Sequence, residues 1–568
     1  MVKPTLVSVI LPTYNEEKNI KRVIRGIWDA LLPYAPELKC EVVVVDDGDD
    51  KTSAIALSMG ARVKKGERQG LGQAIIDGIR IASGDIVVVM DADGSHPASA
   101  LPDMLKPILW QGVDMTIGSR YVKGGGLGDW SLGSRVKSIV GAGLMSLVTG
   151  VKDSNSGYFA FRREVIEGVE LRPSSWKIML EVLFKGHITV RREVPITFGE
   201  RWNGESKNNI RERIRHAKHL IGLLAWKFRR FIQFTLVGGT GNIWHYGLLW
   251  ALTEYAGLWY GFSLVIAIFV AMTNNYLINH YWTFRGEREA NKNLLLGWVK
   301  FIGNSAIGDY GIALPLTIGL ASGLGVWYML ASAFASVAAL FFKYFVSKNW
   351  IWKSAGKKRK AHDPDYEWVS FYHGLPWQKI WKHTIANAVK KLAGDAGRTL
   401  DIGSGSSPAG LLVNHADYVG LDSDRGKMAF MKKKIMQGAQ YDTGSVLSLH
   451  YPDDSFDTVL FVETIEHLRH SGDVQRALVG IRRVLKHGGT LIVATPNYGS
   501  FMGRMQDKLY GIFQRGAYAD EHKVKFTPEI LKETCGYHGF VFVDSIIPMG
   551  SDMVMKFRKG WKVEISGK

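Results

Sequence analysis

The chain contains very little cysteine. Its 568 residues include only Cys40 and Cys535, which lie far apart in the sequence. Two distant cysteines supply neither a disulfide framework nor the paired spacing of a zinc site, so both classes of small stabilised module are excluded. The opening residues, MVKPTLVSVILPTYN, run into a predicted strand and lack the long apolar core of a signal peptide. We therefore expect the soluble regions to stay in a reducing compartment.

Acidic residues are scarce relative to basic ones. The 71 Lys and Arg residues exceed the 53 Asp and Glu residues, which gives a formal net charge of +18. Such an excess is typical of proteins that bind nucleic acid or the anionic face of a membrane. The sequence has no basic helix with base-reading residues, so a nucleic-acid partner is not expected. The length predicts several domains of about 100 to 200 residues each.

Four apolar blocks occupy residues 231–252, 259–281, 298–320 and 328–350. Each block is long enough to cross about 30 Å of hydrocarbon. Basic connections precede the first block (RERIRHAKHLIGLLAWKFRR), separate the second from the third (RGEREANKN) and follow the fourth (KSAGKKRK), whereas TEYAGLWYG and ASGLGVW contain no Lys or Arg. This distribution predicts four spans with both chain ends in the cytoplasm.

The apolar region repeats itself. NNYLINHYWTF (274–284) resembles FKYFVSKNWIW (342–352), and FTLVGGTG from Phe234 resembles FIGNSAIG from Phe301, so two helix pairs are predicted to be duplicated. Polar residues inside the spans are costly and often functional. Asn274, Asn275 and Lys343 therefore indicate either a substrate path or anchors near the cytoplasmic ends of the helices.

The segment 210–230, before the first span, carries apolar residues at helical spacing with basic residues between them. This pattern predicts an amphipathic helix in the membrane interface. A helix that packs against the preceding domain is the alternative interpretation.

The first 205 residues alternate apolar runs with helical stretches. The runs 6–12, 40–47, 85–93 and 114–120 predict an α/β domain with a mainly parallel sheet. Polar residues collect at the carboxyl ends of these runs, where such sheets bind ligands. Asp91 and Asp93 would repel each other unless a cation lay between them, so they predict a divalent metal site, with a solvated turn as the alternative.

Six sequence motifs follow one another in this region: VSVILPTYNEEKNI, VVVVDD, DADGSHP, GSRYVKGG, DSNSGYFAFRREV and FGERWNGESK. Over residues 5–210 their order and spacing resemble family 2 glycosyltransferases of the polyprenyl-phosphate (dolichol-phosphate) mannose synthase type. The apolar blocks resemble the four-helix GtrA-like domain. The resemblance implies a GT-A fold, a Mg²⁺ or Mn²⁺ ion and inverting transfer of a hexose from a nucleotide sugar to a lipid monophosphate. GDP-mannose is favoured as donor, and UDP-glucose or UDP-N-acetylglucosamine stays open.

The same resemblance assigns roles to individual residues. The metal ligands would be Asp91, Asp93 and Ser95, where the family usually has Gln in place of the serine. The nucleotide sugar would lie among Pro12, Tyr14, Glu16, Asp46 and Asp47. The two anionic substrates would be gathered by Arg120, Arg135, Arg201 and Lys207. Because the acceptor phosphate is already an anion, we expect positioning and charge screening to carry catalysis without a general base.

The last 200 residues contain a second ligand motif. RTLDIGSGSSPAG follows a strand-like run, and an acid, Asp422, comes about twenty residues later, which is typical of a nucleotide site. With DDSFDTVLFVETIEHL and IRRVLKHGGTLIVATPN, residues 395–500 resemble class I S-adenosylmethionine-dependent methyltransferases of the type 11 group. The resemblance implies that S-adenosylmethionine contacts Asp401, Gly403, Gly405 and Asp422.

Other residues of this region allow more than one interpretation of the second domain. Ser407 and Ser445 depart from the usual methyltransferase pattern, so a degenerate domain is an alternative. His467 and His522 are candidates for a methyl-transfer base, and a structural role is the alternative for each.

The predicted organisation is an α/β GT-A glycosyltransferase domain (1–209), an interfacial helix (210–230), a four-helix transmembrane domain (231–353), a basic linker (354–375) and an α/β Rossmann-like methyltransferase domain (376–568). We expect an integral membrane enzyme whose partners are a nucleotide sugar, a polyprenyl or dolichyl phosphate and the bilayer. The methyltransferase would act on a lipid-linked or sugar acceptor. The rival interpretation is a lipid-sugar translocator or scaffold with regulatory soluble domains.

Overall fold

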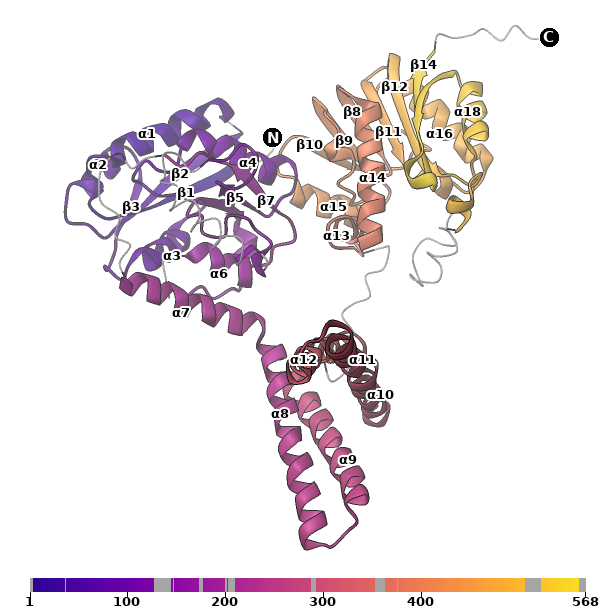
Figure 1. The fold of residues 1–568 in the computed structure, drawn as a ribbon. Coiled ribbons are helices and arrows are strands. Elements are labelled where there is room, and N and C mark those ends of the chain that lie inside the picture. The colour runs from indigo at the N-terminus through magenta and orange to yellow at the C-terminus, as the bar shows by residue number, and fades with distance from the viewer. Residues whose placement is uncertain are drawn as a thin grey trace. The chain divides into compact units, whose positions relative to one another are not determined.

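The protein is seen in a computed structural model that describes residues 4–35, 37–126, 145–146, 148–172, 177–199, 202, 210–287, 293–352, 363–374, 376–505 and 523–560. Two compact units are distinguished. One comprises Met1–His216 and Arg359–Lys568, and the other comprises Ala217–Lys358. The first unit contains two α/β sheets and the second is helical (Figure 1).

The first sheet has the strand order β3-β2-β1-β4-β6-β5-β7. Its strands are β1 (Thr5–Thr13), β2 (Leu38–Asp46), β3 (Arg62–Lys65), β4 (Ile86–Val89), β5 (Met115–Ser119), β6 (Phe159–Arg162) and β7 (Arg191–Pro195). All neighbours pair in parallel except β6, which runs antiparallel to both β4 and β5. The predicted mainly parallel sheet is therefore present, with one reversed strand in its interior.

Helices cover both faces of this sheet because successive residues of its buried strands point to opposite sides. Val7, Val9 and Leu11 of β1 pack with α1 (Ile20–Leu31) and α4 (Leu101–Trp110). Ile10 packs on the other face with α3 (Leu71–Ile81) and α6 (Ile178–Lys185). A short helix, α2 (Thr52–Ser58), follows β2. The result is the three-layer α/β domain that the alternating runs predict.

After α7 (Ile210–Lys227), the helical unit contains four long helical segments, several of which include π-helical turns. The segments are α8 with η4 (Arg229–Trp250, Ala251–Tyr255), α9 with η5 (Tyr260–Ile278, Asn279–Thr283), α10 through η8 (Leu294–Ala306, Ile307–Ala313, Leu314–Ile318, Gly319–Gly323) and α12 with η9 (Tyr328–Val346, Ser347–Ile351). They coincide with the four predicted blocks.

Only two of these segments meet a strict measure of length and apolar composition for crossing a membrane among the described residues. They are Tyr260–Thr283 and Tyr328–Ile351. The segment that begins with α8 includes Asn242 and His245, and the third segment includes Lys300 and Asp309, so polar groups lower their hydropathy. The prediction of four spans is supported in part, by two apolar spans within a four-helix region.

The predicted duplication has a structural counterpart. Asn275 of α9 lies against Gly241 of α8, and Lys343 of α12 lies against Gly308 of η7, so repeat-related side chains occupy repeat-related glycine contacts. A Cβ atom on Gly241 would come within 2.3 Å of Asn275 Nδ2, and one on Gly308 within 2.5 Å of Lys343 Cε. Glycine is therefore what lets each helix pair approach closely.

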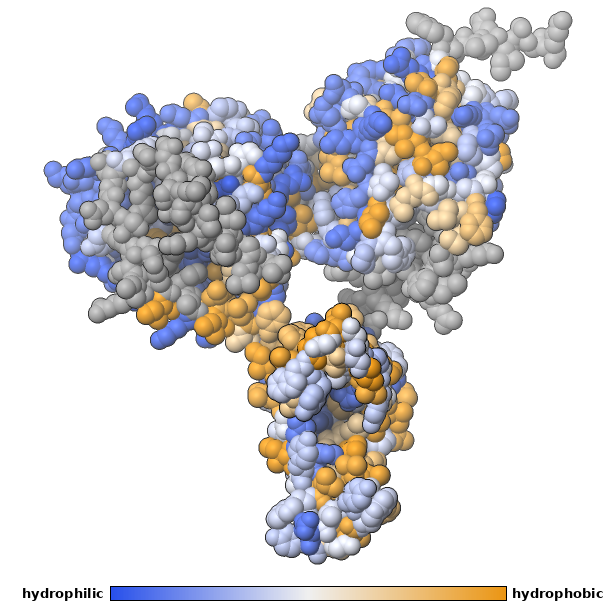
Figure 2. Space-filling view, in the orientation of Figure 1, coloured by the Kyte–Doolittle hydropathy of each residue, from blue (hydrophilic) through white to orange (hydrophobic). Residues whose placement is uncertain are grey.

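Aromatic residues of both repeats share one buried cluster: Phe234, Tyr276, Phe284, Phe301 and Trp352, with Tyr344 packed against it. The Phe284 and Trp352 rings, which are repeat partners, stack with their centroids 4.5 Å apart. Elsewhere the helices expose large apolar side chains, and Figure 2 shows these in orange over much of the visible surface of this unit. An exposed apolar surface of this extent is expected where lipid, not water, is the solvent.

The second sheet has the order β10-β9-β8-β11-β12-β14-β13, with β14 antiparallel to both neighbours. Its strands are β8 (Arg398–Ile402), β9 (Asp417–Asp422), β10 (Ala439–Thr443), β11 (Phe456–Val462), β12 (Leu485–Pro496), β13 (Phe540–Ile546) and β14 (Asp552–Lys559). The helices are α13 (Tyr366–His373), α14 (Pro376–Ala393), α15 (Arg425–Lys434), α16 (Ser471–Val484) and α18 (Pro528–Tyr537). Residues 366–373, predicted as linker, thus form helix α13.

Candidate active sites

The first site is built at one edge of the first sheet. The carboxyl ends of β2, β1, β4 and β5 meet there because these strands run in the same direction. Strand β6 runs the other way, and Phe159 at its start pairs with Val89 and Ile117 at the ends of β4 and β5. The segment that precedes β6 therefore reaches the same edge. A sequence analysis that considers only the residues that follow each strand does not identify such a segment.

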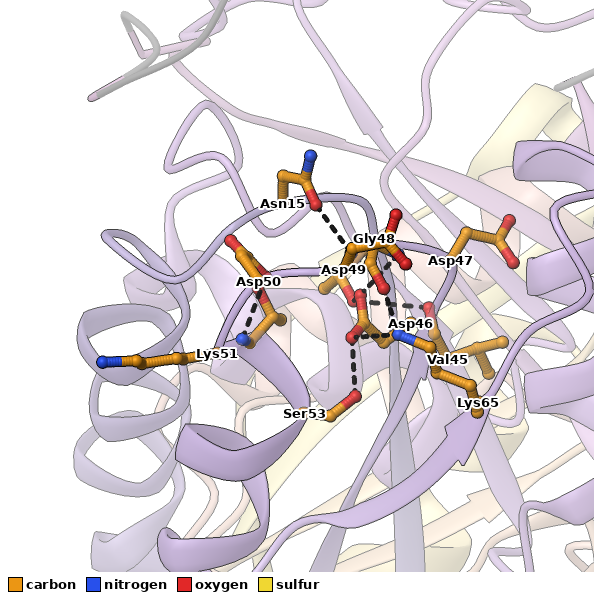
Figure 3. A network of polar contacts seen from close by, with 12 residues as sticks. Asn15, Val45, Asp46, Asp47, Gly48, Asp49, Asp50, Lys51, Ser53 and Lys65 are labelled. Atoms are coloured by element: carbon orange, nitrogen blue, oxygen red, sulfur yellow. Dashed lines mark hydrogen bonds and ion pairs between the residues drawn. The ribbon is translucent and has the colours of Figure 1, made fainter.

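The turn after β2 is held by Asp46, which is completely buried. Its Oδ1 accepts hydrogen bonds from Gly48 N at 3.0 Å and from Thr13 Oγ1 at 3.1 Å, and its Oδ2 accepts one from Ser53 Oγ at 2.6 Å. Figure 3 shows this network together with Lys65, whose Nζ lies 3.5 Å from Asp46 Oδ2. Asp46 therefore shapes the turn, and it presents neither oxygen to solvent.

The other predicted nucleotide residues differ in exposure. Pro12 is buried in β1, and Asp47 accepts a hydrogen bond from Arg68 N at 3.0 Å. Tyr14 is 46% exposed and could contact a ligand directly. Glu16 Oε2 accepts a hydrogen bond from Asn19 Nδ2 at 2.7 Å, which places its carboxylate at the amino end of α1. The structure brings these four residues and Asp46, the five that were predicted, to the ends of β1 and β2.

Asp91 and Asp93 follow β4, as predicted. The Asp93 carboxylate is oriented by Ser95, whose Oγ and backbone N donate to Asp93 Oδ1 at 2.6 and 3.0 Å. The Asp91 side chain is 34% exposed and lies beside His96, with 3.7 Å between His96 Nδ1 and Asp91 Oδ2. His96 Nδ1 accepts the Asp91 backbone N–H at 2.8 Å, and burial lowers the pKa of this imidazole. A neutral His96 thus fixes the Asp91 turn.

The Arg120 guanidinium is already paired with a carboxylate of the protein. Its Nε and Nη2 donate to the two oxygens of Asp153 at 2.7 and 2.8 Å, and both side chains are nearly inaccessible. Burial opposes the charge of Arg120, but the hydrogen bonds that it donates to Asp153 hold its pKa above the usual value. The pair forms a fixed, bidentate unit of the kind that gives Arg precise geometry. Asp153 belongs to the segment before β6 and was not among the predicted residues.

Lys177 is a second residue that the sequence did not single out. It is 5% exposed, and its Nζ donates to the backbone O of Asn155. Burial, followed by the nearby positive charge of Arg120, lowers its pKa to about 7, while Asp153 and Asp91 partly offset this shift. An anion placed beside Lys177 would restore its charge, so this group is suited to an anionic ligand.

Two close contacts complete the edge. A Cβ atom on Gly157 would lie 3.1 Å from His96 Cε1 and 3.5 Å from Asp91 Oδ2, so the absence of a side chain lets the pre-β6 segment approach Asp91. On the other side, Trp202 N donates to Asp93 O at 3.1 Å, and the guanidinium of Arg22 lies 3.8 Å above the Trp202 ring. Trp202 therefore lies over the Asp93 turn.

Three of the predicted basic residues, Arg135, Arg201 and Lys207, lie outside the described residues. Within the described ranges, no group of three or more His, Cys, Asp or Glu side chains is arranged to hold a metal ion. The donor set at Asp91 and Asp93 consists of two carboxylates. Two protein carboxylates completed by water and substrate phosphates are the usual arrangement for Mg²⁺, so this donor set fits such an ion.

The second site is a cavity of about 760 Å³ at the carboxyl ends of β8, β9 and β11. Gly403 has φ +71°, and a Cβ atom there would lie 2.2 Å from Thr464 Oγ1. Gly405 has φ +52°, and its N–H donates to Asp422 Oδ2 at 2.9 Å. Asp422 Oδ1 accepts Asp424 N at 2.8 Å, so the predicted acid and glycine turn form one cradle.

Asp401 lies behind this cradle. Its Oδ2 accepts a hydrogen bond from Tyr418 Oη at 2.6 Å, and the residue is 5% exposed. Burial raises the pKa of Asp401 to about 7, the bond from Tyr418 opposes this shift, and the charge of Asp422 adds to it. Asp401 therefore has a structural partner, in addition to a place in the cavity wall.

Helix α13 contributes residues that the sequence did not identify. Glu367 Oε1 pairs with Lys427 Nζ at 2.5 Å, and its Oε2 accepts a hydrogen bond from Ser406 N at 3.3 Å. Although burial opposes ionisation, Lys427 holds the pKa of Glu367 below its ordinary value. Tyr366, Glu367 and Phe371 line the cavity, and Ser407, Ser445 and His467 do so as well. His522 lies outside the described residues.

One part of the cavity wall carries two further carboxyl groups. Glu463 and Glu466 follow β11, and both line the cavity together with Trp381 of α14. Burial raises the pKa of Glu463 to about 7 and that of Glu466 to about 8. Trp381 Nε1 donates to Asp552 Oδ2 at 2.6 Å, and the charge of Asp552 contributes to raising both values.

Three protein families match successive parts of the chain. Glycosyl transferase family 2 matches residues 8–169, the GtrA/DPMS transmembrane domain matches residues 233–352, and a methyltransferase domain matches residues 400–493. The class is therefore a membrane-associated glycosyltransferase fused to an S-adenosylmethionine-dependent methyltransferase domain.

Curated relatives make the first part more specific. A dolichol-phosphate mannosyltransferase from Pyrococcus furiosus is 34% identical over 362 residues, which cover 61% of this chain and 99% of that protein. A polyprenol monophosphomannose synthase from Mycolicibacterium smegmatis is 34% identical over 37% of this chain and 85% of its own length. A dolichol-phosphate mannosyltransferase from Saccharomyces cerevisiae is 31% identical over 39% and 88%. The chain belongs to the dolichol-phosphate mannosyltransferase family, and the resemblance seen in its motifs is confirmed.

Proposed function

We propose that the first domain transfers a hexose from a nucleotide sugar to a polyprenyl or dolichyl monophosphate with inversion. The observation that carries this proposal is the grouping, at one sheet edge, of the Asp91 and Asp93 carboxylates with Lys177 and the Arg120–Asp153 pair. A site where two phosphate-bearing substrates meet needs carboxylates that hold a metal cation and positively charged side chains that attract the phosphates.

The residues of this chain perform most of the chemistry by positioning. An acceptor phosphate oxygen attacks the anomeric carbon of the hexose, the bond to the donor diphosphate breaks, and the diphosphate leaves with the electron pair. Asp91 and Asp93 would hold Mg²⁺ or Mn²⁺, which supplies charge screening for the diphosphate when bound. Ser95 keeps the Asp93 carboxylate in place, and His96 holds the backbone of Asp91, through the bonds described above. Arg120 and Lys177 would attract the phosphates, and no general base is required.

The donor is proposed to be GDP-mannose, because the relatives are named as mannosyltransferases. Tyr14 is the exposed residue that could stack on a base, and Asp46 supports it by holding the neighbouring turn. UDP-glucose or UDP-N-acetylglucosamine is the competing donor, since the turn around Asp46 and Asp47 is short.

The helical unit is proposed to span the membrane four times, with both soluble domains and both chain ends in the cytoplasm. The basic connections on one side of the predicted blocks support this arrangement. A cysteine introduced in the connection 253–259 should react with a membrane-impermeant reagent from outside intact cells. A tag at the C-terminus should resist external protease, and digestion of that tag would contradict the four-span topology.

The second domain is proposed to bind S-adenosylmethionine and to methylate a lipid-linked or sugar acceptor. The glycine turn fits such a group, because side chains at Gly403 and Gly405 would fill or distort the cradle. Asp422 would take ribose hydroxyls, and when bound the cofactor supplies an electrophilic methyl group. A role limited to scaffolding or lipid translocation is the alternative, and the intact acidic and basic groups of the first site speak against it.

The test of the first activity uses the full chain in nanodiscs. Labelled GDP-mannose, UDP-glucose and UDP-N-acetylglucosamine are each supplied with a short polyprenyl phosphate and Mg²⁺. We expect organic-extractable label from GDP-mannose, and loss of that label with chelator. Label from a UDP-sugar alone would change the donor assignment, and no label from any donor would overturn the proposed reaction.

A further inference from the structure

The acidic wall of the methyltransferase cavity contains more carboxylate than cofactor binding requires. Asp422 already faces the glycine cradle, and Glu367 is paired with Lys427. Glu463 and Glu466 instead come from the end of β11 and line the cavity beside Trp381. They are not accounted for by the cradle, so they define a separate part of the cavity, which we name the acceptor wall.

Position within the fold places Glu463 next to the glycine cradle. Its neighbour in sequence, Thr464, has the side chain that lies against Gly403 of the cradle. Glu463 also adopts φ +48°, a left-handed conformation that a non-glycine residue reaches only at a cost. The cost is sustained by the Glu463 N–H, which donates to Ala494 O at 2.8 Å. The backbone is therefore bent so that this carboxyl lies in the cavity wall.

Glu466 supplies the second observation. It is 1% exposed, it lines the cavity, and its Oε2 accepts no hydrogen bond of good geometry among the described residues, although the Thr495 hydroxyl lies near enough to lower its pKa slightly against the larger effect of burial. A buried carboxyl whose oxygens are incompletely hydrogen-bonded is costly, and a ligand hydroxyl would complete its bonding. Burial raises the pKa of Glu463 to about 7 and that of Glu466 to about 8, so near neutral pH Glu463 is partly ionised and Glu466 is largely protonated. Such carboxyls can both accept and donate hydrogen bonds.

Trp381 gives the acceptor wall a flat apolar surface. The ring is half-buried, and its Nε1 is held by Asp552 Oδ2 at 2.6 Å, so its orientation is fixed. An aromatic face beside convergent carboxyl groups fits a ligand that is apolar on one face and rich in hydroxyls at its edge. A sugar ring has this character.

We infer that the acceptor wall binds a sugar and that Glu463 takes the proton from the sugar hydroxyl that becomes methylated. This inference deepens the proposed function and rests on it, since the cofactor must bind the adjacent cradle. Glu466 and Trp381 position the ring. The product of the first domain, a lipid-linked hexose, presents hydroxyls of this kind.

The step balances without any further reactant. The hydroxyl oxygen forms a new bond to the methyl carbon, the carbon–sulfur bond of the sulfonium breaks, and its electron pair stays on sulfur to leave a neutral thioether. The hydroxyl proton passes to the Glu463 carboxylate and is later released to water. A carboxylate whose proton affinity lies near neutral is matched to this task.

The experiment uses the full chain in nanodiscs with labelled S-adenosylmethionine. Three probes are compared: the polyprenyl-phosphate hexose formed by the first site, octyl β-D-mannopyranoside as a soluble sugar, and octylamine as an amine. We expect label in both sugar probes and none in the amine. Glu463→Gln should lower the methylation rate at saturating acceptor by about 100-fold or more. Its affinity for S-adenosylmethionine, measured by calorimetry, should change by less than about threefold, because the cradle is untouched.

The control is Glu533→Gln, an exposed carboxylate on α18, which should behave as the wild type. Methylation by Glu463→Gln at more than about a third of the wild-type rate would overturn the proton-acceptor role. Cofactor binding with label only in the amine, or with no label in either sugar probe, would overturn the sugar acceptor while leaving cofactor binding intact. Failure of the wild type to bind S-adenosylmethionine would instead refute the proposed methyltransferase function, and the inference would fall with it.

Discussion

The two candidate sites both collect carboxyl groups at a sheet edge, but they differ in whether those groups face a cation. Each lies at the carboxyl edge of a seven-stranded sheet, and each gathers several carboxylates there. In the first site the buried acids face cations, as with Asp153 and Arg120 or Asp46 and Lys65. In the second site, Glu463 and Glu466 lie in the cavity wall with raised pKa values.

This difference indicates which class of ligand each site is suited to bind. Paired charges keep their ionised form, so the first site presents fixed positive and negative groups to phosphate-bearing ligands. Carboxyls that hold a proton near neutral pH are suited to hydroxyl ligands and to proton transfer. The chemistry of a sheet edge therefore depends on the partners of its acids more than on their number.

The largest effect should follow from Asp93→Asn. Removing one of two carboxylates that could hold the metal should lower sugar transfer by about 1,000-fold or more, measured with labelled donor. Binding of S-adenosylmethionine to the same variant should be unchanged. Full sugar transfer by this variant in excess chelator would remove the metal assignment.

Gly403→Ala should produce the next largest effect, at the other site. The Cβ atom would lie 2.2 Å from Thr464 Oγ1 at a residue with φ +71°. We expect about 100-fold weaker binding of S-adenosylmethionine by calorimetry. Sugar transfer serves as the internal control and should match the wild type. Equal loss at both sites would show that they are not independent.

Lys177→Met should reduce sugar transfer by about tenfold, because a cation next to Arg120 would no longer attract the phosphates. Lys152→Met is the matched control, since Lys152 is an exposed lysine of the pre-β6 segment that Lys177 contacts through Asn155 O. Both variants should be assayed at several donor concentrations. A Lys177→Met enzyme with wild-type turnover and affinity would exclude Lys177 from the site.

The smallest effect concerns stability. The pKa of Glu466 is raised to about 8 in the folded protein, so the folded state binds more protons than the unfolded state between about pH 4.5 and 8. The stabilising contribution is therefore complete at low pH and is lost as the pH rises through that range. Glu466→Gln should remove much of this loss, on the order of 2 kcal/mol at pH 8.

Hydrogen exchange of peptides from β11 and β12 in the full chain, at pH 5.5 and pH 8, would report this change. The wild type should open more readily at pH 8, and Glu466→Gln should show a smaller difference. An identical pH response in the two proteins would mean that Glu466 is ionised in the folded state.

The sequence predicted the sheet edges well because parallel strands place their following residues together. Asp91, Asp93 and Asp422 are found where their motifs indicate. Asp153 was missed for a topological reason, since the reversed β6 brings to the edge a segment that precedes a strand. Lys177 was missed because it directly precedes helix α6, and only its hydrogen bond to Asn155 O reveals that it reaches this segment. The DSNSG stretch within a recognised motif was the available signal.

Burial was the other property that the sequence could not give. From the sequence, Asp46 is expected to be a ligand-binding acid at a strand end. In the structure its two oxygens are instead engaged by three hydrogen-bond donors and by Lys65, which come from three chain segments. Glu367 lies in a stretch whose composition is typical of a linker, and only its pairing with Lys427 reveals its place at the cavity. Both outcomes depend on contacts distant in sequence.

The glycine contacts of the duplicated helices have a consequence for the charge of this region. In one repeat, Asn275 lies against Gly241, and Asn242 follows that glycine; in the other, Lys343 lies against Gly308, and Asp309 follows it. Lys343 Nζ pairs with Asp309 Oδ1 at 2.5 Å. The glycine contact sets the helix spacing in both copies, while the polar residues beside it are neutral in one copy and oppositely charged in the other. The two halves of this membrane region therefore share one packing geometry and differ in the charge that they place at the same position.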